Sequence, residues 1–364
     1  AVSTAQVFLG TRLQCAQCHN HPYERWTMDD YYNWTTLFAR VDYKVVENRR
    51  RDTNDKHEFV GEQIVFIKDT GGVSHPRTGR DAKARFLGAK DIDPDNTPDR
   101  LEALATWLTA PENKQFARAQ ANRVWFHLFG RGIVDPVDDF RSTNLPSHPE
   151  LLDRLAAELI KSGYDLRQLI RTIAGSRTYQ ASSTPNETNR EDDANFSRAT
   201  VRRLTAEQML DAESQFTGVP LEFNGYPSGT RATQIPGVDS IRRRNRAGSA
   251  DQFLAVFGKP PRLIPSECER SGDTTMGQAF QLISGPTVHS LLSRTANRLD
   301  ELLKSGRSNA EIIDEVYWSA LSRPASKTEL DALEKHMAGS TDRRAALEDI
   351  SWALLNAKEF VFRK

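Results

Sequence analysis

The pentapeptide Cys15-Ala16-Gln17-Cys18-His19 restricts what this 364-residue chain can fold into more than any other stretch. Cys-x-x-Cys-His is the attachment sequence of a c-type haem. The two thiols add covalently to the porphyrin edge, and the adjacent histidine reaches the iron as its proximal ligand. The pattern therefore predicts that Cys15 and Cys18 hold a covalent haem c and that His19 binds its iron.

Two other kinds of site use the same residue types. A zinc knuckle needs four ligands, usually from a second pair of Cys or His residues, and the one remaining cysteine, Cys268, is far along the chain with no partner beside it. A redox dithiol of the thioredoxin type should open a helix after a strand, and the flanking sequence lacks that pattern. Haem is the preferred interpretation, and both alternatives stay open.

The sixth ligand of the iron decides what a haem at this position can do. A histidine or methionine there gives an electron carrier, whereas an open position admits small oxidants or other ligands. His75 is the preferred candidate, because its turn-rich segment, residues 74–79, can be aimed at a haem. The other candidates are His21, Met28, His57, His127 and His148. His21 follows His19 too closely to reach the opposite face of the same ring, and it could instead bind a second metal or make a hydrogen bond. A core position for Met28, a core or interface position for His127, an exposed loop for His57 and a helix cap for His148 are the simpler explanations.

Composition excludes several classes of partner. The 49 basic and 49 acidic residues balance, so no net field draws the chain to nucleic acid or to an anionic membrane. No apolar run is long enough for a transmembrane helix. Covalent haem is attached after export, so we expect a periplasmic or otherwise exported protein. The start at Ala1 suggests a processed or truncated product of a longer protein.

Helical periodicity dominates the chain from residue 97 onward. Three segments have the capping-box pattern that starts a helix, namely Ser147-x-x-Glu150, Thr205-x-x-Gln208 and Ser326-x-x-Glu329. Apolar residues recur at the spacing of three and four that marks a buried helix face. Helices are therefore expected at about residues 112–129, 274–284, 287–305, 309–322, 327–338 and 342–357.

Residues 41–95 differ from the rest, since the segments 43–46 and 59–67 are β-like. The predicted fold class is thus mainly α, a multi-helix domain with a small N-terminal haem-binding segment and a short β-hairpin insertion. We expect a haem-binding region over residues 1–95 and a helical domain over residues 96–364. The Gly-, Pro- and Arg-rich residues 219–265 predict a long irregular loop, and such loops are often functional or cover another part of the fold.

Several blocks of the sequence resemble a known pair of domains. Residues 8–22, followed by Trp26 and Asp30-Tyr31-Tyr32, resemble the C-terminal part of a planctomycete-type cytochrome c domain. The blocks at 122–125, 128–134, 138–140 and 354–360 resemble the partner domain that usually follows it. The resemblance covers nearly the whole chain and implies haem and export. The biochemical activity of this family is unknown.

Polar residues near one helix end invite two interpretations. Asn122, Arg123, Arg131, Asp138 and Asp139 can form a buried network that fixes the helix and its following turn. Alternatively, Arg123 or Arg131 binds a haem propionate or an anionic substrate, because the planar guanidinium group can donate two parallel hydrogen bonds to a carboxylate. Both interpretations stay open.

Three functions are compatible with these motifs. The first is an exported c-type haem protein that transfers electrons, as a redox subunit that meets a redox partner or other subunits of a larger complex. The second is a haem-dependent oxidoreductase acting on a small oxidant or a carbohydrate-like substrate. The third is a structural or binding module in which haem or metal only stabilises the structure. One haem needs far less chain than this, which favours a role beyond simple electron carriage.

Overall fold

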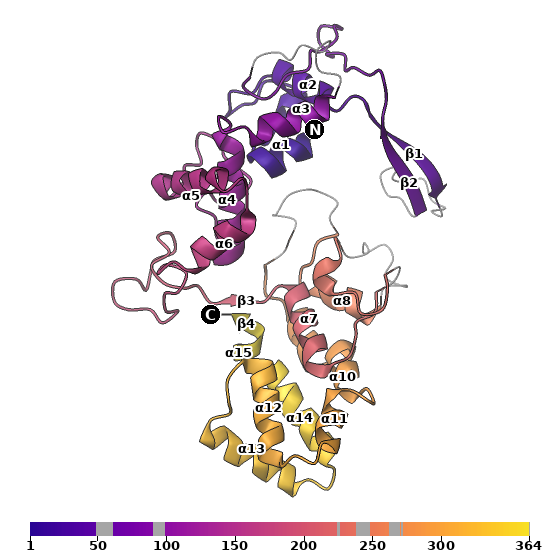
Figure 1. The fold of residues 1–364 in the computed structure, drawn as a ribbon, viewed down its shortest axis with the longest axis vertical. Helices are drawn as coiled ribbons and strands as arrows, with labels where there is room; N and C mark the ends of the chain where they lie inside the picture. Colours follow the sequence, from indigo (N-terminus) through magenta and orange to yellow (C-terminus); the bar gives the residue numbers. More distant parts are fainter. Residues whose placement is uncertain are drawn as a thin grey trace. The chain divides into compact units, whose positions relative to one another are not determined.

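The computed structural model describes residues 1–48, 61–89, 99–223, 226–237, 248–261, 270 and 272–363. The fold is mainly α, as predicted, and helices occupy most of the ribbon (Figure 1). The chain forms two compact units, residues 1–181 with 187–197, and residues 182–186 with 198–364. The units therefore divide about a hundred residues beyond the predicted domain boundary at 95/96, and the first unit contains the Cys-x-x-Cys-His segment.

The first unit opens with the elements that carry the motif. They are α1 (Val2–Leu9), the short 3-10 helix η1 (Gln14–Gln17) and α2 (Met28–Thr36). Helix α1 ends at Gly10, whose φ of 63° is left-handed and where a Cβ would lie 2.4 Å from the Phe140 ring. Only glycine fits such a position without strain. The backbone of Phe140 also donates to the Gly10 carbonyl at 2.9 Å, so the start of the chain is fastened to a distant loop.

The described part of the first unit contains four further helices, α3 (Arg100–Thr109), α4 (Lys114–Phe129), α5 (Pro149–Lys161) and α6 (Leu166–Ala174). Asp99 caps α3. Residue 97, from which helical periodicity was predicted, lies outside the described residues. The predicted capping box at Ser147 is wrong. Helix α5 is capped by His148 without a side-chain bond, because the Ser147 hydroxyl donates to the Ile133 carbonyl instead.

The core of the first unit lies around Trp34, which is fully buried on α2. Its indole N–H donates to the Ala1 carbonyl at 2.9 Å, and its ring meets those of Phe38 and Trp107 edge-on. Helices α3 and α4 come from the predicted partner domain, yet Leu104 and Leu108 of α3 complete this core. The motif segment is therefore built on side chains from both predicted domains.

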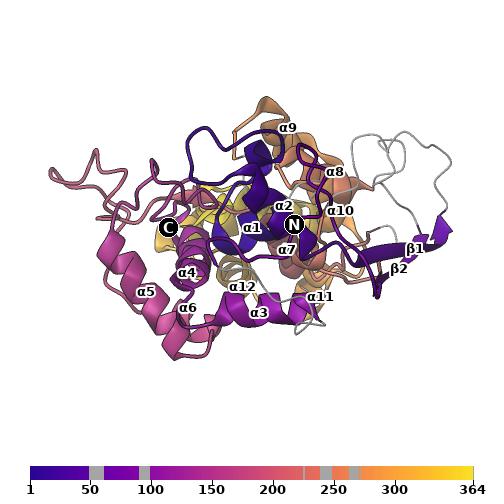
Figure 2. The same ribbon diagram turned by 90° about the horizontal axis from the view of Figure 1, so that it is seen from above.

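The predicted β-hairpin is confirmed. Strands β1 (Val41–Asn48) and β2 (Gly61–Ile67) pair antiparallel, with Val41 opposite Ile67 and an irregularity between Val45 and Glu47. Figures 1 and 2 show the two strands side by side, reaching away from the helices α1, α2 and α3.

The second unit is a helical bundle with one small sheet. Strands β3 (Arg202–Arg203) and β4 (Phe362–Arg363) pair antiparallel and bring its two ends together. Its described helices are α7 (Ala206–Thr217), η2 (Ala232–Gln234), α8 (Ser249–Val256), α9 (Met276–Ser284), α10 (Pro286–Ser293), α11 (Arg298–Lys304), α12 (Asn309–Leu321), α13 (Lys327–Gly339), α14 (Arg343–Leu355) and α15 (Lys358–Val361).

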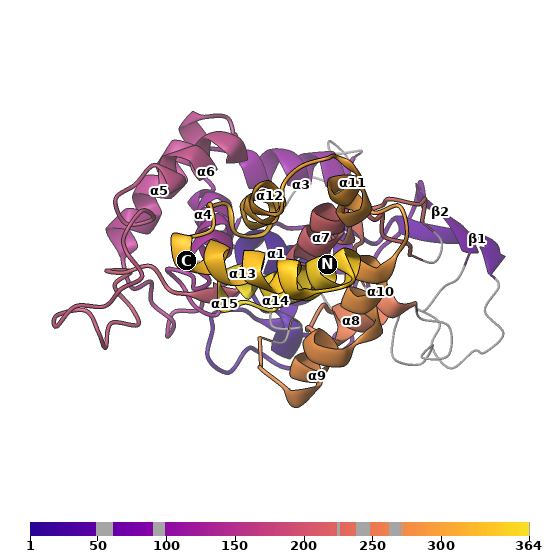
Figure 3. The ribbon, with the colours of Figure 1, turned by 90° about the horizontal axis from the view of Figure 1, so that it is seen from below.

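The capping boxes predicted at Thr205 and Ser326 are confirmed. Helices α13 and α14 lie against each other (Figure 3).

The helix expected over residues 287–305 is two helices, α10 and α11. The chain turns at Ala296, whose φ of 58° is left-handed. Asn297 stabilises both sides of this break, because its amide donates to the carbonyls of Leu291 and Leu292 and its oxygen caps the first turn of α11. Asn297 thus bonds unpaired carbonyls at the end of α10 and unpaired N–H groups at the start of α11, and this favours two helices over one continuous helix.

The predicted irregular loop at 219–265 is only partly irregular. It contains η2 and α8, and Phe253 and Leu254 of α8 are fully buried in the core of the second unit. Lys259, which is also buried, donates to the carbonyls of Ala232 and Ile235 at 2.8 and 2.6 Å. This segment therefore contributes buried side chains to the core of the second unit. The predicted loop also contains an arginine-rich stretch at residues 242–246, and this stretch and Cys268 lie outside the described residues.

Candidate functional site

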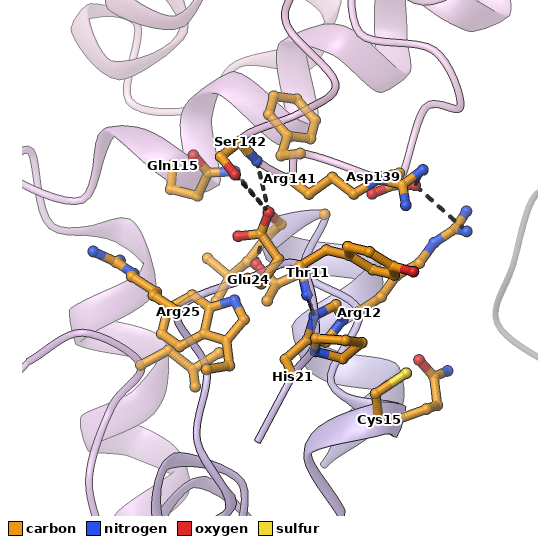
Figure 4. Close-up of a pocket in the computed structure, with 18 of the residues that line it drawn as sticks. Thr11, Arg12, Cys15, His21, Glu24, Arg25, Gln115, Asp139, Arg141 and Ser142 are labelled. Atoms are coloured by element: carbon orange, nitrogen blue, oxygen red, sulfur yellow. Dashed lines mark hydrogen bonds and ion pairs between the residues drawn. The ribbon is translucent and has the colours of Figure 1, made fainter. Parts of the chain in front are cut away.

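A cavity of about 600 Å³ opens beside the motif in the first unit (Figure 4). This volume is within the range of natural ligand and cofactor pockets. Its apolar wall consists of Leu9, Leu87, Trp26, Trp107 and Phe140. The polar and charged residues that line it include Arg12, Cys15, His21, Glu24, Arg25, Asp139, Arg141 and Ser142.

The two motif cysteines are held at the surface by a buried neighbour. Ala16 is fully buried in η1, whereas Cys15 and Cys18 are exposed on either side of it, with free thiols. Cys15 lines the cavity, and Cys18 and His19 lie on the exposed turn that follows. Because the backbone is anchored through Ala16, both thiols remain accessible for covalent attachment.

The contact of His19 with its neighbour favours the tautomer in which the neutral ring can bind a metal through Nε2. Its Nδ1 lies 2.7 Å from the carbonyl oxygen of Asn20. A carbonyl only accepts hydrogen bonds, so Nδ1 carries the proton, and the lone pair of the neutral ring is on Nε2. Metal-binding histidines are commonly oriented in this way, with the second ring nitrogen donating to a carbonyl or carboxylate.

The contact made by His21 favours the other tautomer of the neutral ring. The backbone N–H of Tyr23 donates to its Nδ1 at 3.2 Å, so the proton of the neutral ring is on Nε2. His21 is half-buried and lines the cavity. This ring therefore offers a hydrogen-bond donor to whatever occupies the cavity, whereas His19 offers a lone pair.

His75 is buried close to the motif but does not line the cavity. Its ring centroid is 5.0 Å from that of Tyr32, whose hydroxyl donates to the Gln17 carbonyl at 3.1 Å. Its Nδ1 accepts from the Arg77 backbone N–H, and its Nε2 lies 3.2 Å from an Asp29 oxygen without the alignment of a hydrogen bond. To bind an iron, His75 would have to turn away from Asp29, and its role as a ligand stays a prediction.

The buried polar network expected after α4 is present. Asn122 is fully buried, and its side chain bonds the N–H and carbonyl of Val134 at 2.9 and 2.8 Å. Asp138, also fully buried, accepts from Gln6 and Arg12 at 2.6 Å each. This network joins the loop after α4 to the segment that carries the motif.

The two arginines predicted to bind an anion lie elsewhere. Arg123 donates to the Val7 carbonyl at 3.3 Å and Arg131 to the Asp193 carbonyl, and neither lines the cavity. The arginines that do line it are Arg12, Arg25 and Arg141. Sequence reasoning missed them, although Arg12 and Arg25 flank the motif and Arg141 follows the Asp138-Asp139-Phe140 block.

Glu24 ties the two sides of the cavity together. Its carboxylate accepts from the backbone N–H of Ser142 at 2.7 Å and from the Ser142 hydroxyl at 3.1 Å (Figure 4). Elsewhere in the wall, the Gln115 amide on α4 donates to the Leu9 carbonyl at the end of α1 at 2.8 Å. The cavity is thus closed by bonds between segments more than a hundred residues apart in the sequence.

The remaining ligand candidates are placed as follows. Met28 is half-buried at the start of α2, and His148 is the N-cap residue of α5. His127 is exposed near the end of α4, which contradicts a core position, and a position at an interface stays a prediction. His57 lies outside the described residues. Within the described ranges, no three or more His, Cys, Asp or Glu side chains gather at a spacing that could hold a metal ion.

Family models match most of the chain. Residues 99–337 match the model of PSD1, a protein family of unknown function (DUF1553), and this is more than half of the chain. The chain belongs to the PSD1 family. Residues 1–43 match PSCyt2, also of unknown function (DUF1549), so this PSD1-family chain carries the planctomycete cytochrome c-associated pair that its motifs predicted. Neither the curated proteins nor the solved structures contain a match.

The cavity draws its walls from both matched segments. Cys15, His21 and Arg25 belong to the PSCyt2 match, and Gln115 and Arg141 to the PSD1 match. Across the described part of the chain, the structure has no helix with the length and apolar character needed to span a membrane.

Proposed function

We propose that this PSD1-family chain is an exported c-type haem protein that serves as an electron-transfer or redox subunit of a larger complex. Cys15 and Cys18 hold the haem covalently, and His19 binds its iron from the proximal side. The single observation that carries this proposal is the orientation of His19, whose lone pair is left on Nε2 beside two free, exposed thiols. When bound, haem supplies a centre that gains and loses one electron.

The cavity beside Cys15 supports the same proposal. Apolar rings such as Trp26, Trp107 and Phe140 suit the face of a porphyrin, and the arginines at its rim suit the carboxylates of one. Because both thiols are exposed, a haem held by Cys15 and Cys18 would be accessible from the surface, which suits exchange of electrons with a partner. That partner is another redox protein or another subunit of an exported complex.

A pyridine haemochrome spectrum of protein made with a cytochrome c maturation system tests the attachment. Wild-type protein should carry one covalent haem, and replacing both Cys15 and Cys18 with alanine should abolish it. His19→Gln should keep the covalent haem but change the spectrum, because the iron loses its proximal nitrogen. A wild-type protein without covalent haem would refute the proposal.

His21 favours a second candidate, a haem-dependent oxidoreductase acting on a small oxidant. His21 lines the same cavity as Cys15, and with its Nδ1 accepting from Tyr23, the Nε2–H of the neutral ring can donate to a bound small molecule. Carbon monoxide separates the two functions. Tight binding to the native reduced protein indicates an open iron position and favours the enzyme, whereas no binding favours the six-coordinate carrier.

A further inference from the structure

Strand β2 has an uncovered edge. Among the described residues it pairs with β1 alone, and all seven of its residues are exposed. Its sequence between Glu62 and Lys68, Gln-Ile-Val-Phe-Ile, carries no charge. Figures 1 and 2 show the hairpin reaching away from α1, α2 and α3. An apolar, uncovered edge strand is a template for a further strand, and a lone two-stranded hairpin is marginally stable in water.

The ladder between β1 and β2 fixes which backbone groups point out from this edge. The Lys68 N–H donates to the Arg40 carbonyl at 2.8 Å, so these two residues are a hydrogen-bonded pair. Hydrogen-bonded and non-hydrogen-bonded pairs alternate along an antiparallel ladder. The N–H and C=O groups of Gln63, Val65 and Ile67 therefore point away from β1, toward the place of an added strand.

The side chains of β2 also favour a partner outside the hairpin. Four apolar side chains are between 40% and 59% exposed, namely Ile64, Val65, Phe66 and Ile67. Glu62 lies opposite Glu47 of β1, and like charges directly opposite each other destabilise a sheet. Lys68 lies 3.1 Å from Asp42, and both side chains are 44% exposed. An ammonium group has three donors, so Lys68 can bind a second carboxylate as well.

A second copy of β2 complements this edge when it runs antiparallel about Val65. Val65 then lies opposite Val65 of the second copy, and Ile64 lies opposite Phe66 in non-hydrogen-bonded pairs, whose side chains approach most closely. The same register places Glu62 opposite Lys68 of the second copy at both ends of the contact. Moving the register by two residues in either direction keeps the hydrogen-bonding pattern but separates Glu62 from Lys68. The charges therefore select one register.

We propose that two copies of this chain associate through β2 across a two-fold axis and form one antiparallel sheet in the order β1-β2-β2-β1. Such a contact is isologous, so each favourable pair off the axis occurs twice. The added strand contacts less surface than the roughly 800 Å² per partner of a standard interface, so we expect a dissociation constant in the micromolar range, about 10 μM. This inference goes beyond the proposed function and does not depend on haem.

Sedimentation equilibrium of the whole chain over roughly 1 to 300 μM tests the association. Wild type should form dimers. Val65→Lys places like charges directly opposite each other on the axis and should weaken dimerisation about tenfold or more. Val45→Lys is the matched control, because Val45 is 54% exposed on the same face of the hairpin but lies on β1. This control should dimerise as wild type does.

Charge reversal tests the register. Glu62→Lys and Lys68→Glu should each weaken self-association about tenfold, because each places like charges at both ends of the contact. An equimolar mixture of these two variants should dimerise about as strongly as wild type, because opposite charges then face each other again. Circular dichroism follows the fold of every variant. If Val65→Lys does not fold, the mixture decides.

A wild type that stays monomeric up to about 300 μM overturns the proposal. Equal weakening by Val65→Lys and Val45→Lys also overturns it, because the contact would then use a face of the hairpin and not the edge of β2. A mixture of Glu62→Lys and Lys68→Glu that dimerises no better than either variant alone overturns the proposed pairing. Each of these outcomes leaves the proposed function standing.

Discussion

Glu213 provides the sharpest stability prediction in this chain. It lies on α7 and is fully buried in the core of the second unit, beside apolar residues of the same helix such as Met209 and Leu210. Neither of its carboxyl oxygens has a hydrogen-bond partner. Burial raises the pKa of Glu213 from an ordinary value near 4.5 to about 8, because a charged carboxylate is poorly solvated there.

The raised pKa fixes how stability depends on pH. The unfolded chain loses this proton near pH 4.5 and the folded chain only near pH 8. Stability is therefore full below pH 4.5 and falls progressively as the pH rises toward 8. At pH 7, folding has to protonate a group that is ionised in the unfolded chain, which costs about 3 kcal/mol at 1.36 kcal/mol for each pH unit above the unfolded pKa.

Glu213→Gln removes the titration and keeps the shape of the side chain. The variant and the wild type should be about equally stable below pH 4.5, whereas at pH 7 the variant should be more stable by about 3 kcal/mol. Urea unfolding followed by circular dichroism between pH 4 and pH 8 measures the difference. Glu301→Gln, at an exposed position on α11, is the control and should show no such trend.

A pH-independent difference between wild type and Glu213→Gln would refute this reasoning. A stability difference between variant and wild type that becomes less favourable to the variant from pH 4.5 to pH 7 would also refute it. Either result would mean that Glu213 is ionised in the folded protein and is stabilised by a partner.

Two further stability predictions concern the contacts that build each unit. Gly10→Ala should lower the free energy of unfolding by about 2 kcal/mol or more, because a Cβ there meets the Phe140 ring and the backbone is left-handed; thermal unfolding measures it, and an unchanged midpoint would contradict the assigned turn. Lys259→Met should cost about 3 kcal/mol, because it leaves the Ala232 and Ile235 carbonyls and part of the Glu207 charge unpaired. It should also speed limited proteolysis of the segment it holds, and a cleavage rate equal to that of wild type would count against that role.

Local signals in the sequence predicted much of the fold. Thr205 and Ser326 start helices as expected, because a capping box depends only on residues three positions apart. Ser147 has the same pattern but bonds the Ile133 carbonyl, a partner that only the folded chain brings near. The break at Ala296 was missed for a similar reason, since it depends on carbonyls that Asn297 reaches across a turn.

The candidate site likewise combines residues that are neighbours in the sequence with residues that only folding brings together. The motif at Cys15 to His19 is contiguous, so the sequence alone predicts it. The arginines of the cavity are not contiguous, and whether Arg123 or Arg25 faces it depends on how segments far apart in the chain pack. Arg123 and Arg131 were candidates because of their neighbours in sequence, yet Arg123 bonds the Val7 carbonyl, and neither lines the cavity. The arginines that line it are Arg12, Arg25 and Arg141.

The attachment of haem to Cys15 and Cys18 is the claim on which the redox function rests. Denaturing mass spectrometry of the protein made with a cytochrome c maturation system, followed by sequencing of the peptide around residue 15, tests it most directly. We predict one haem per chain that survives denaturation, on a peptide that contains both cysteines. A peptide of unmodified mass, with both thiols free to react with an alkylating agent, would contradict it.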